Sequence, residues 1–228
     1  MEVQLRHQPS FAVARFLLGP GEPIRAEAGA MMAMASDTQI EAKAEGGVMK
    51  SLKRAALGGE SIFITTLTAG PGGGWVDLAA NLPGDLAEID VVAGRPWLLS
   101  KTSFLGCART VELETRCQGG KMFVGGEGAF LMEAAGEGKL VISAYGAIDR
   151  FTLEAGQSLA VDSQHFVACE QSVQYTITRA AQGSWVQSVK SAEGLVFHFT
   201  GPGELMMQSR SPQGLVGWLA ANGLGNRA

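Results

Sequence analysis

Short runs of apolar and β-branched residues, separated by turns rich in glycine and proline, make up most of the chain. Residues 173–178 alternate apolar and polar side chains, which is the period of a half-buried strand. Segments of this kind, bounded by turn residues, predict β-strands. The predicted strands are residues 61–68, 122–124, 129–132, 139–143, 172–178 and 195–200.

Two segments have helical spacing instead. Residues 47–57 place Val48 and Leu52 on one side and basic residues on the others. Residues 211–220 begin with Ser-Pro, a suitable N-cap and first helical residue, and carry Leu215 and Trp218 at helical spacing. The sequence therefore predicts an all-β protein with two short helices.

Two stretches of the chain repeat each other. Residues 89–107 and 151–169 share Ala-Gly, a Phe ten residues after that Gly and a Cys thirteen residues after it. The matching pairs are Gly94 and Gly156, Phe104 and Phe166, and Cys107 and Cys169, each 62 positions apart. A second Gly-rich block follows each copy, at 134–146 and 199–211. Residues 26–34 and 68–79 resemble these two kinds of block more loosely and supply a third copy. We therefore predict three internal repeats.

The repeats are expected at about 20–80, 82–146 and 150–210, within one compact domain of 228 residues. No long linker separates them. The 31 glycines fit this interpretation, because many tight turns need the positive φ that glycine adopts without steric cost.

Composition narrows the function classes. The net charge of −4 disfavours a nucleic-acid-binding surface. The N-terminus lacks a secretory signal, no run of 18 apolar residues occurs, and the three cysteines form no CxxC pair. These observations predict a cytoplasmic protein with free thiols.

Four blocks of sequence resemble one family in their order along the chain: 20–34, 46–69, 81–91 and 123–146. They contain Glu-Ala-Gly-Ala-Met-Met, Gly-Glu-Ser-x-Phe and Leu-Pro-Gly-Asp. This pattern resembles the altered-inheritance-of-mitochondria family of mitochondrial biogenesis proteins, in its bacterial form. The resemblance implies a fold like that of the tryptophan RNA-binding attenuation protein, a β-sandwich related to the double-stranded β-helix. It also implies a homotrimer, and it carries over no established activity.

No constellation of residues predicts catalysis, a metal or a cofactor. The three histidines, at positions 7, 165 and 198, occur in no HxH, HxxE or HExxH motif. Four residues separate His165 from Cys169, which is about 13 Å along a strand and too far for a Cys–His pair. The glycine loops lack the Lys-Ser/Thr of a P-loop. We therefore predict no catalytic, cofactor-binding or metal-binding residues, and a protein that is not an enzyme.

Two features suggest contacts with partners. Lys50, Lys53 and Arg54 interleave with apolar residues, so this helix could either contact an anionic membrane surface or a protein partner, or pack on its own sheet. Met31, Met32 and Met34 form an uncharged stretch that suits an interior strand or a subunit interface.

These features predict a non-enzymatic scaffold or binding protein that assembles as a homotrimer and acts peripherally at a membrane. Two alternatives stay open. One is a small-molecule-binding or catalytic β-sandwich with a pocket between repeats. The other is an RNA-binding β-assembly. The acidic composition makes nucleic acid the less favoured class of partner.

Overall fold

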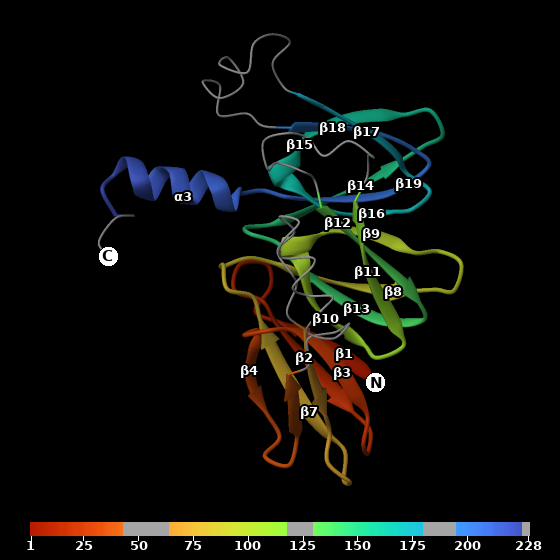
Figure 1. Ribbon diagram of the computed structural model, residues 1–228, viewed down its shortest axis with the longest axis vertical. Helices are drawn as coiled ribbons and strands as arrows, with labels where there is room; N and C mark the ends of the chain where they lie inside the picture. Colours follow the sequence, from red (N-terminus) through yellow and green to blue (C-terminus); the bar gives the residue numbers. More distant parts are fainter. Residues whose placement is uncertain (43–63, 118–129, 180–194, 225–228) are drawn as a thin grey trace.

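The computed structural model describes residues 1–42, 64–117, 130–179 and 195–224, which are coloured in Figure 1. These residues form mostly β-strands, so the predicted all-β fold class is confirmed. The other regular elements in these ranges are helix α3 (Pro212–Ala221) and the 3-10 turns η1 (Lys101–Ser103) and η2 (Ser163–His165). The predicted helix at 47–57 and the strand at 122–124 lie outside the described residues.

The strands pair antiparallel into four sheets, which we number from the N-terminal end. The first sheet has the order β1 (Glu2–Arg6), β2 (Val13–Leu18), β7 (Gly74–Ala79), β4 (Met31–Met34). The second has the order β5 (Gln39–Ala42), β6 (Ile64–Thr68), β3 (Pro23–Glu27), β10 (Phe104–Ala108), β13 (Gly138–Ser143), β8 (Leu86–Val91).

The third sheet has the order β11 (Val111–Cys117), β12 (Phe130–Gly136), β9 (Trp97–Ser100), β16 (Phe166–Glu170), β19 (Gly203–Gln208), β14 (Ile148–Leu153). The fourth has the order β15 (Ser158–Asp162), β18 (Leu195–Thr200), β17 (Gln174–Arg179). The predicted strands at 139–143, 172–178 and 195–200 correspond to β13, β17 and β18, and that at 129–132 overlaps β12.

One numbering rule relates all four sheets. Each strand of the third sheet has a number six higher than the strand at the same place in the second sheet. Subtracting six from the strand numbers of β10, β13 and β8 gives β4, β7 and β2 of the first sheet. Adding six to β11, β12 and β9 gives β17, β18 and β15 of the fourth. Strands that differ by six are called corresponding strands below.

Three hydrophobic cores lie between the four sheets. The two middle sheets are buried on both faces, because neighbouring residues on one strand point into different cores. Leu98 packs into the core against the fourth sheet, whereas Leu99 packs into the core against the second sheet. This burial explains why the middle strands are continuous apolar runs such as Trp-Leu-Leu rather than alternating sequences.

The sequence offset of 62 residues joins positions with the same local structure. Gly94 and Gly156 have φ of 78° and 81°. Phe104 and Phe166 are 0% and 2% exposed, and the paired cysteines 107 and 169 are both buried. The limits of the three repeats and the single-domain organisation stay predictions.

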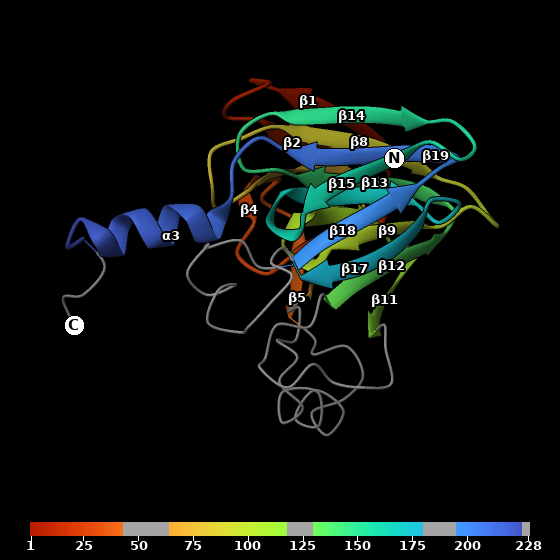
Figure 2. The same ribbon diagram turned by 90° about the horizontal axis from the view of Figure 1, so that it is seen from above.

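Helix α3 begins as the Ser-Pro dipeptide predicts. The Ser211 hydroxyl accepts a hydrogen bond from the Gly214 backbone N–H at 3.0 Å, and Pro212 occupies the first turn. The helix projects away from the stacked sheets in both views and buries none of its residues (Figures 1 and 2). In the described part of the chain, no helix is long and apolar enough to span a membrane.

Candidate interaction surface

The thiols that the sequence places at matching positions are structural. Cys107 and Cys169 are both fully buried. Burial, and next the charge of Glu170, raise the pKa of Cys169 to about 12, so this thiol stays protonated near neutral pH. Among the described residues, no group of three His, Cys, Asp or Glu could hold a metal ion.

The two histidines of the C-terminal part make local polar contacts. His165 Nδ1 lies 2.7 Å from the Gln208 carbonyl oxygen, and His198 Nε2 lies 2.9 Å from the Thr178 hydroxyl. The candidate basic residues Lys50, Lys53 and Arg54 lie outside the described residues. Their contact with a membrane or a partner stays a prediction.

The methionine stretch forms β4, which is an edge strand of the first sheet (Figure 1). Met31 is 38% exposed and Met32 is 54% exposed. Met34 is partly buried against the core between the first and second sheets. Sequence reasoning left open an interior strand or an interface, and the structure places the strand at an outer edge.

The exposure of β4 is unlike that of its corresponding strands, β10 and β16. All three strands carry a bulge at the same place: Met31↔Leu78 is followed by Ala33↔Asp77, Phe104↔Ile142 by Gly106↔Val141, and Phe166↔Met207 by Ala168↔Met206. This register makes Met31 the counterpart of Phe104 and Phe166, and Met32 the counterpart of Leu105 and Val167.

Those four counterparts are between 0% and 2% exposed. They lie in the cores between the sheets, and their strands β10 and β16 also pair on their outer sides with β3 and β9. No described strand pairs with the outer side of β4. We call this strand, with the exposed side chains of Met31 and Met32, the β4 edge.

The β4 edge also differs in charge from the other edges of the first three sheets. Edge strands β1, β5, β8, β11 and β14 all carry charged residues, for example Glu41 on β5 and Glu88 on β8. Charged residues on edge strands hinder pairing with other chains. Because β4 reads Met-Met-Ala-Met, it has no such protection.

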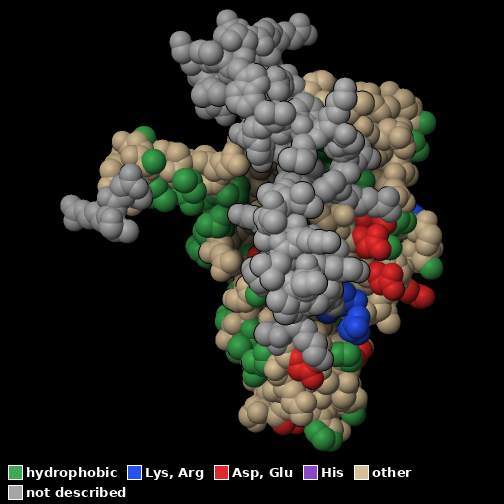
Figure 3. All heavy atoms as spheres, in the orientation of Figure 1, with side chains coloured by type: hydrophobic (Ala, Val, Ile, Leu, Met, Phe, Trp, Pro, Cys, Tyr) green, Lys and Arg blue, Asp and Glu red, His purple; other side chains and the backbone are tan. Residues whose placement is uncertain are grey.

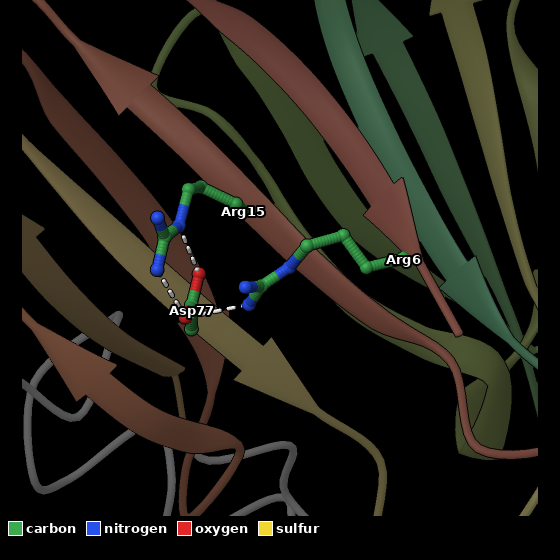
Figure 4. Close-up of polar contacts among 3 residues, drawn as sticks. All are labelled: Arg6, Arg15 and Asp77. Carbon is green, nitrogen blue, oxygen red and sulfur yellow. Dashed lines mark hydrogen bonds and ion pairs between the residues drawn. The ribbon is translucent and has the colours of Figure 1, made fainter. Parts of the chain in front are cut away.

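A charged cluster of three side chains joins strands β1, β2 and β7 of the first sheet (Figure 4). The Asp77 carboxylate accepts hydrogen bonds from Arg6 Nη2 at 2.7 Å, and from Arg15 Nε at 2.7 Å and Nη2 at 2.8 Å. The Arg15 guanidinium also lies 4.1 Å from the centre of the Trp75 ring. We call Arg6, Arg15 and Asp77 the first-sheet triad.

The triad fixes a carboxylate in an otherwise apolar strand. The Asp77 side chain is only 3% exposed. Burial alone would raise the pKa of Asp77, but hydrogen bonds from Arg15 and then Arg6, with their charges, outweigh burial and lower this pKa. Its counterparts on β13 and β19, Val141 and Met206, are 0% and 1% exposed between sheets.

Sequence reasoning missed the triad. Its one local signal is Asp77 itself, a lone carboxylate between Val76 and Leu78 on a strand, because a buried charge needs a partner of opposite charge. The first sheet thus has a polar outer face, as the terminal unit of a stacked protein does, next to an apolar edge.

Helix α3 adds exposed apolar surface. Val216 and Trp218 are 65% and 59% exposed, and Leu224 beyond the helix is 66% exposed. Figure 3 shows hydrophobic side chains along α3 and at the side of the body where Figure 1 places β4. A patch that is apolar and exposed in this way is typical of an interaction site.

Comparison with known proteins finds matches over most of the chain. The family model described as "Mitochondrial biogenesis AIM24" matches residues 3–210. An uncharacterized protein of Streptococcus pyogenes serotype M6 is 29% identical over 187 residues, covering 80% of this chain and 73% of that protein.

A solved structure extends the likeness to the fold. The X-ray crystal structure of protein SPYM3_0169 from Streptococcus pyogenes superposes with a TM-score of 0.82 at 26% sequence identity. The match covers 97% of this chain and 99% of that chain.

Proposed function

The chain belongs to the mitochondrial biogenesis AIM24 family, and from that premise we propose that it is a non-enzymatic scaffold or binding protein that assembles with itself as a homotrimer. The exposed β4 edge supports this function. Its residues are uncharged and half exposed, whereas their counterparts on corresponding strands are buried.

The energetics favour a partner at this edge. Full burial of a Met side chain contributes about 1.5–3 kcal/mol, so completing the burial of Met31 and Met32 contributes on the order of 1 kcal/mol each. A strand partner would also pair the backbone groups that the outer side of β4 presents to solvent. Repeated at each contact of a trimer, these contributions add.

Native mass spectrometry, with a substitution at the edge, tests the assembly. The wild-type chain of 23.9 kDa is expected at three times its mass, and Met32→Glu is expected as a monomer, because the edge would then carry a charge. Val92→Glu is the matched control, since Val92 is 49% exposed but lies between β8 and β9, away from the edge. A monomeric wild type at micromolar concentration would overturn the proposal.

We also propose that the assembled protein acts at an anionic membrane surface through Lys50, Lys53 and Arg54. Three cations near such a surface contribute about 1 kcal/mol each, and copies held together in a trimer add their contributions by avidity. Vesicles containing phosphatidylserine should co-sediment with the wild type and not with the Lys50/Lys53/Arg54→Glu variant. Equal binding of the two proteins would overturn the membrane role.

A further inference from the structure

One kind of strand pairing occurs twice within this chain, and two further sheet edges each present one strand of such a pairing without its partner. Strand β10 pairs with β3, and β16 pairs with β9; we call each of these strand pairs a joint. The numbering rule of six makes β4 the strand that corresponds to β10 and β16. It makes β15 the strand that corresponds to β3 and β9.

In the described part of the chain, neither of these two strands has a joint. Strand β15 pairs with β18 on one side only, and β4 pairs with β7 on one side only. The two strands lie at opposite ends of the long axis of the molecule (Figure 1), so they cannot pair within one chain. Strands β4 and β15 are therefore the two partners of a joint, and each of them lies at a different end of the molecule.

The two joints within the chain predict the register of a joint between β4 and β15. In the joint of β10 and β3, Cys107 lies opposite Arg25. In the joint of β16 and β9, Cys169 lies opposite Leu98. The bulge makes Met34 the counterpart of the two cysteines.

The neighbouring strand gives the other side of the register. Leu98 lies opposite Glu133 on β12, and Ala160 lies opposite His198 on the corresponding strand β18. This makes Ala160 the counterpart of Leu98, 62 positions further along the chain.

We propose that β15 of one copy pairs antiparallel with β4 of a second copy, with Met34 opposite Ala160 and Ala35 opposite Leu159. This inference rests on the proposed self-assembly and names the strands that carry it.

The charges on the two strands agree with this joint. Strand β15 reads Ser-Leu-Ala-Val before Asp162, whose carboxylate accepts a hydrogen bond from the Gln164 backbone N–H at 2.8 Å. Strand β4 therefore has no charged residue, and the one charged residue of β15 is its last, so neither edge has a charge at the paired positions Met34, Ala35, Leu159 and Ala160.

The polar outer face of the first sheet selects the geometry. Because the Asp77 carboxylate and its two arginines lie on that face, the proposed contact uses the strand edge rather than face-to-face packing. The two partner surfaces differ, so the contact is heterologous and closes into a ring when the rotation between copies allows it. A homotrimer is the ring with three such joints.

Disulfide trapping tests the register. The probe is the full chain with Cys117→Ser, carrying Met34→Cys and Ala160→Cys, oxidised at the concentration where the wild type is assembled. Residues directly opposite each other on paired strands fall within disulfide reach, whereas diagonal neighbours lie about 7–8 Å apart and do not. The matched control pair is therefore Met34→Cys with Ser158→Cys.

We expect the in-register pair to form about tenfold more intermolecular disulfide than the control pair. Two single variants, Met34→Cys and Ala160→Cys, should cross-link when mixed and not separately, since the joint is head to tail. A second pair, Ala35→Cys with Leu159→Cys, gives the same test should Met34→Cys disturb the core. Circular dichroism verifies that each variant is folded.

The outcomes separate this inference from the proposed function. Self-assembly without cross-linking of either in-register pair would overturn the β4–β15 joint and leave the scaffold proposal standing. Equal cross-linking of the in-register and control pairs would overturn the register and with it the joint. A wild type that stays monomeric would overturn both proposals.

Discussion

Replacing Asp77 with Asn tests the first-sheet triad. The substitution keeps the size of the side chain but removes its charge and one of its acceptor oxygens. Three charge-assisted hydrogen bonds of 2.7–2.8 Å are weakened or lost. A hydrogen bond to a charged group contributes about 1.5–3 kcal/mol to stability when it is buried.

The two arginine side chains lower that figure, because Arg6 is 35% and Arg15 is 28% exposed and water partly screens them. We therefore expect Asp77→Asn to reduce the free energy of unfolding by about 2–3 kcal/mol in total. For a chain of this length, that corresponds to a fall in Tm of roughly 5–10 °C.

The effect should depend on pH in a defined direction. The pKa of Asp77 is lower in the folded protein than in the unfolded chain, where it is about 3.9. The stabilisation is therefore fully present above about pH 5 and is lost as the pH falls through the unfolded and then the folded pKa. The difference in stability between wild type and Asp77→Asn should shrink between pH 5 and pH 3.

Urea unfolding at several pH values is the assay, because guanidinium chloride would screen the ion pairs. Asp149→Asn is the matched control, since Asp149 is exposed on edge strand β14 and should change stability by less than about 0.5 kcal/mol. An undiminished stability gap at pH 3 would refute the electrostatic reasoning, and so would a stability of Asp77→Asn equal to that of the wild type at pH 7.

Three further substitutions test the packing. Leu99→Ala empties a position that is 0% exposed between the second and third sheets, and should cost about 2–5 kcal/mol in urea unfolding. Gly84→Ala should lower Tm by at least roughly 5 °C, because the new methyl group would overlap the Ala144 carbonyl oxygen; Gly72→Ala, which meets open space, should change Tm by less than about 2 °C. Ser211→Ala should cost helix α3 about 1 kcal/mol and speed its amide exchange, while Tm stays unchanged because the helix buries no residue.

Local features of this fold could be predicted from the sequence because they depend on neighbouring residues. The Ser211-Pro212 start of α3 and the strand at 195–200 follow from capping and from β-branched composition. The offset that pairs Phe104 with Phe166 was also readable, because corresponding strands bury the same side-chain types.

The interaction surface could not be predicted, because it depends on sheet order. Met31 and Phe104 stand at corresponding places, and both are apolar. Met31 is 38% exposed on the edge strand β4, whereas Phe104 is 0% exposed on a strand with neighbours on both sides. The triad was hidden for the same reason, since Arg6 and Asp77 meet across 71 positions of the chain.

Amide hydrogen exchange as a function of protein concentration tests the assembly at the β4 edge most directly. On assembly, we expect amides of β4 and β15 to exchange at least about tenfold more slowly than in the diluted monomer, because a joint pairs their free sides. Amides of the charged edge strands β1 and β14 should keep their rates. Unchanged exchange of β4 and β15 in an assembled sample would show that these strands do not carry the assembly.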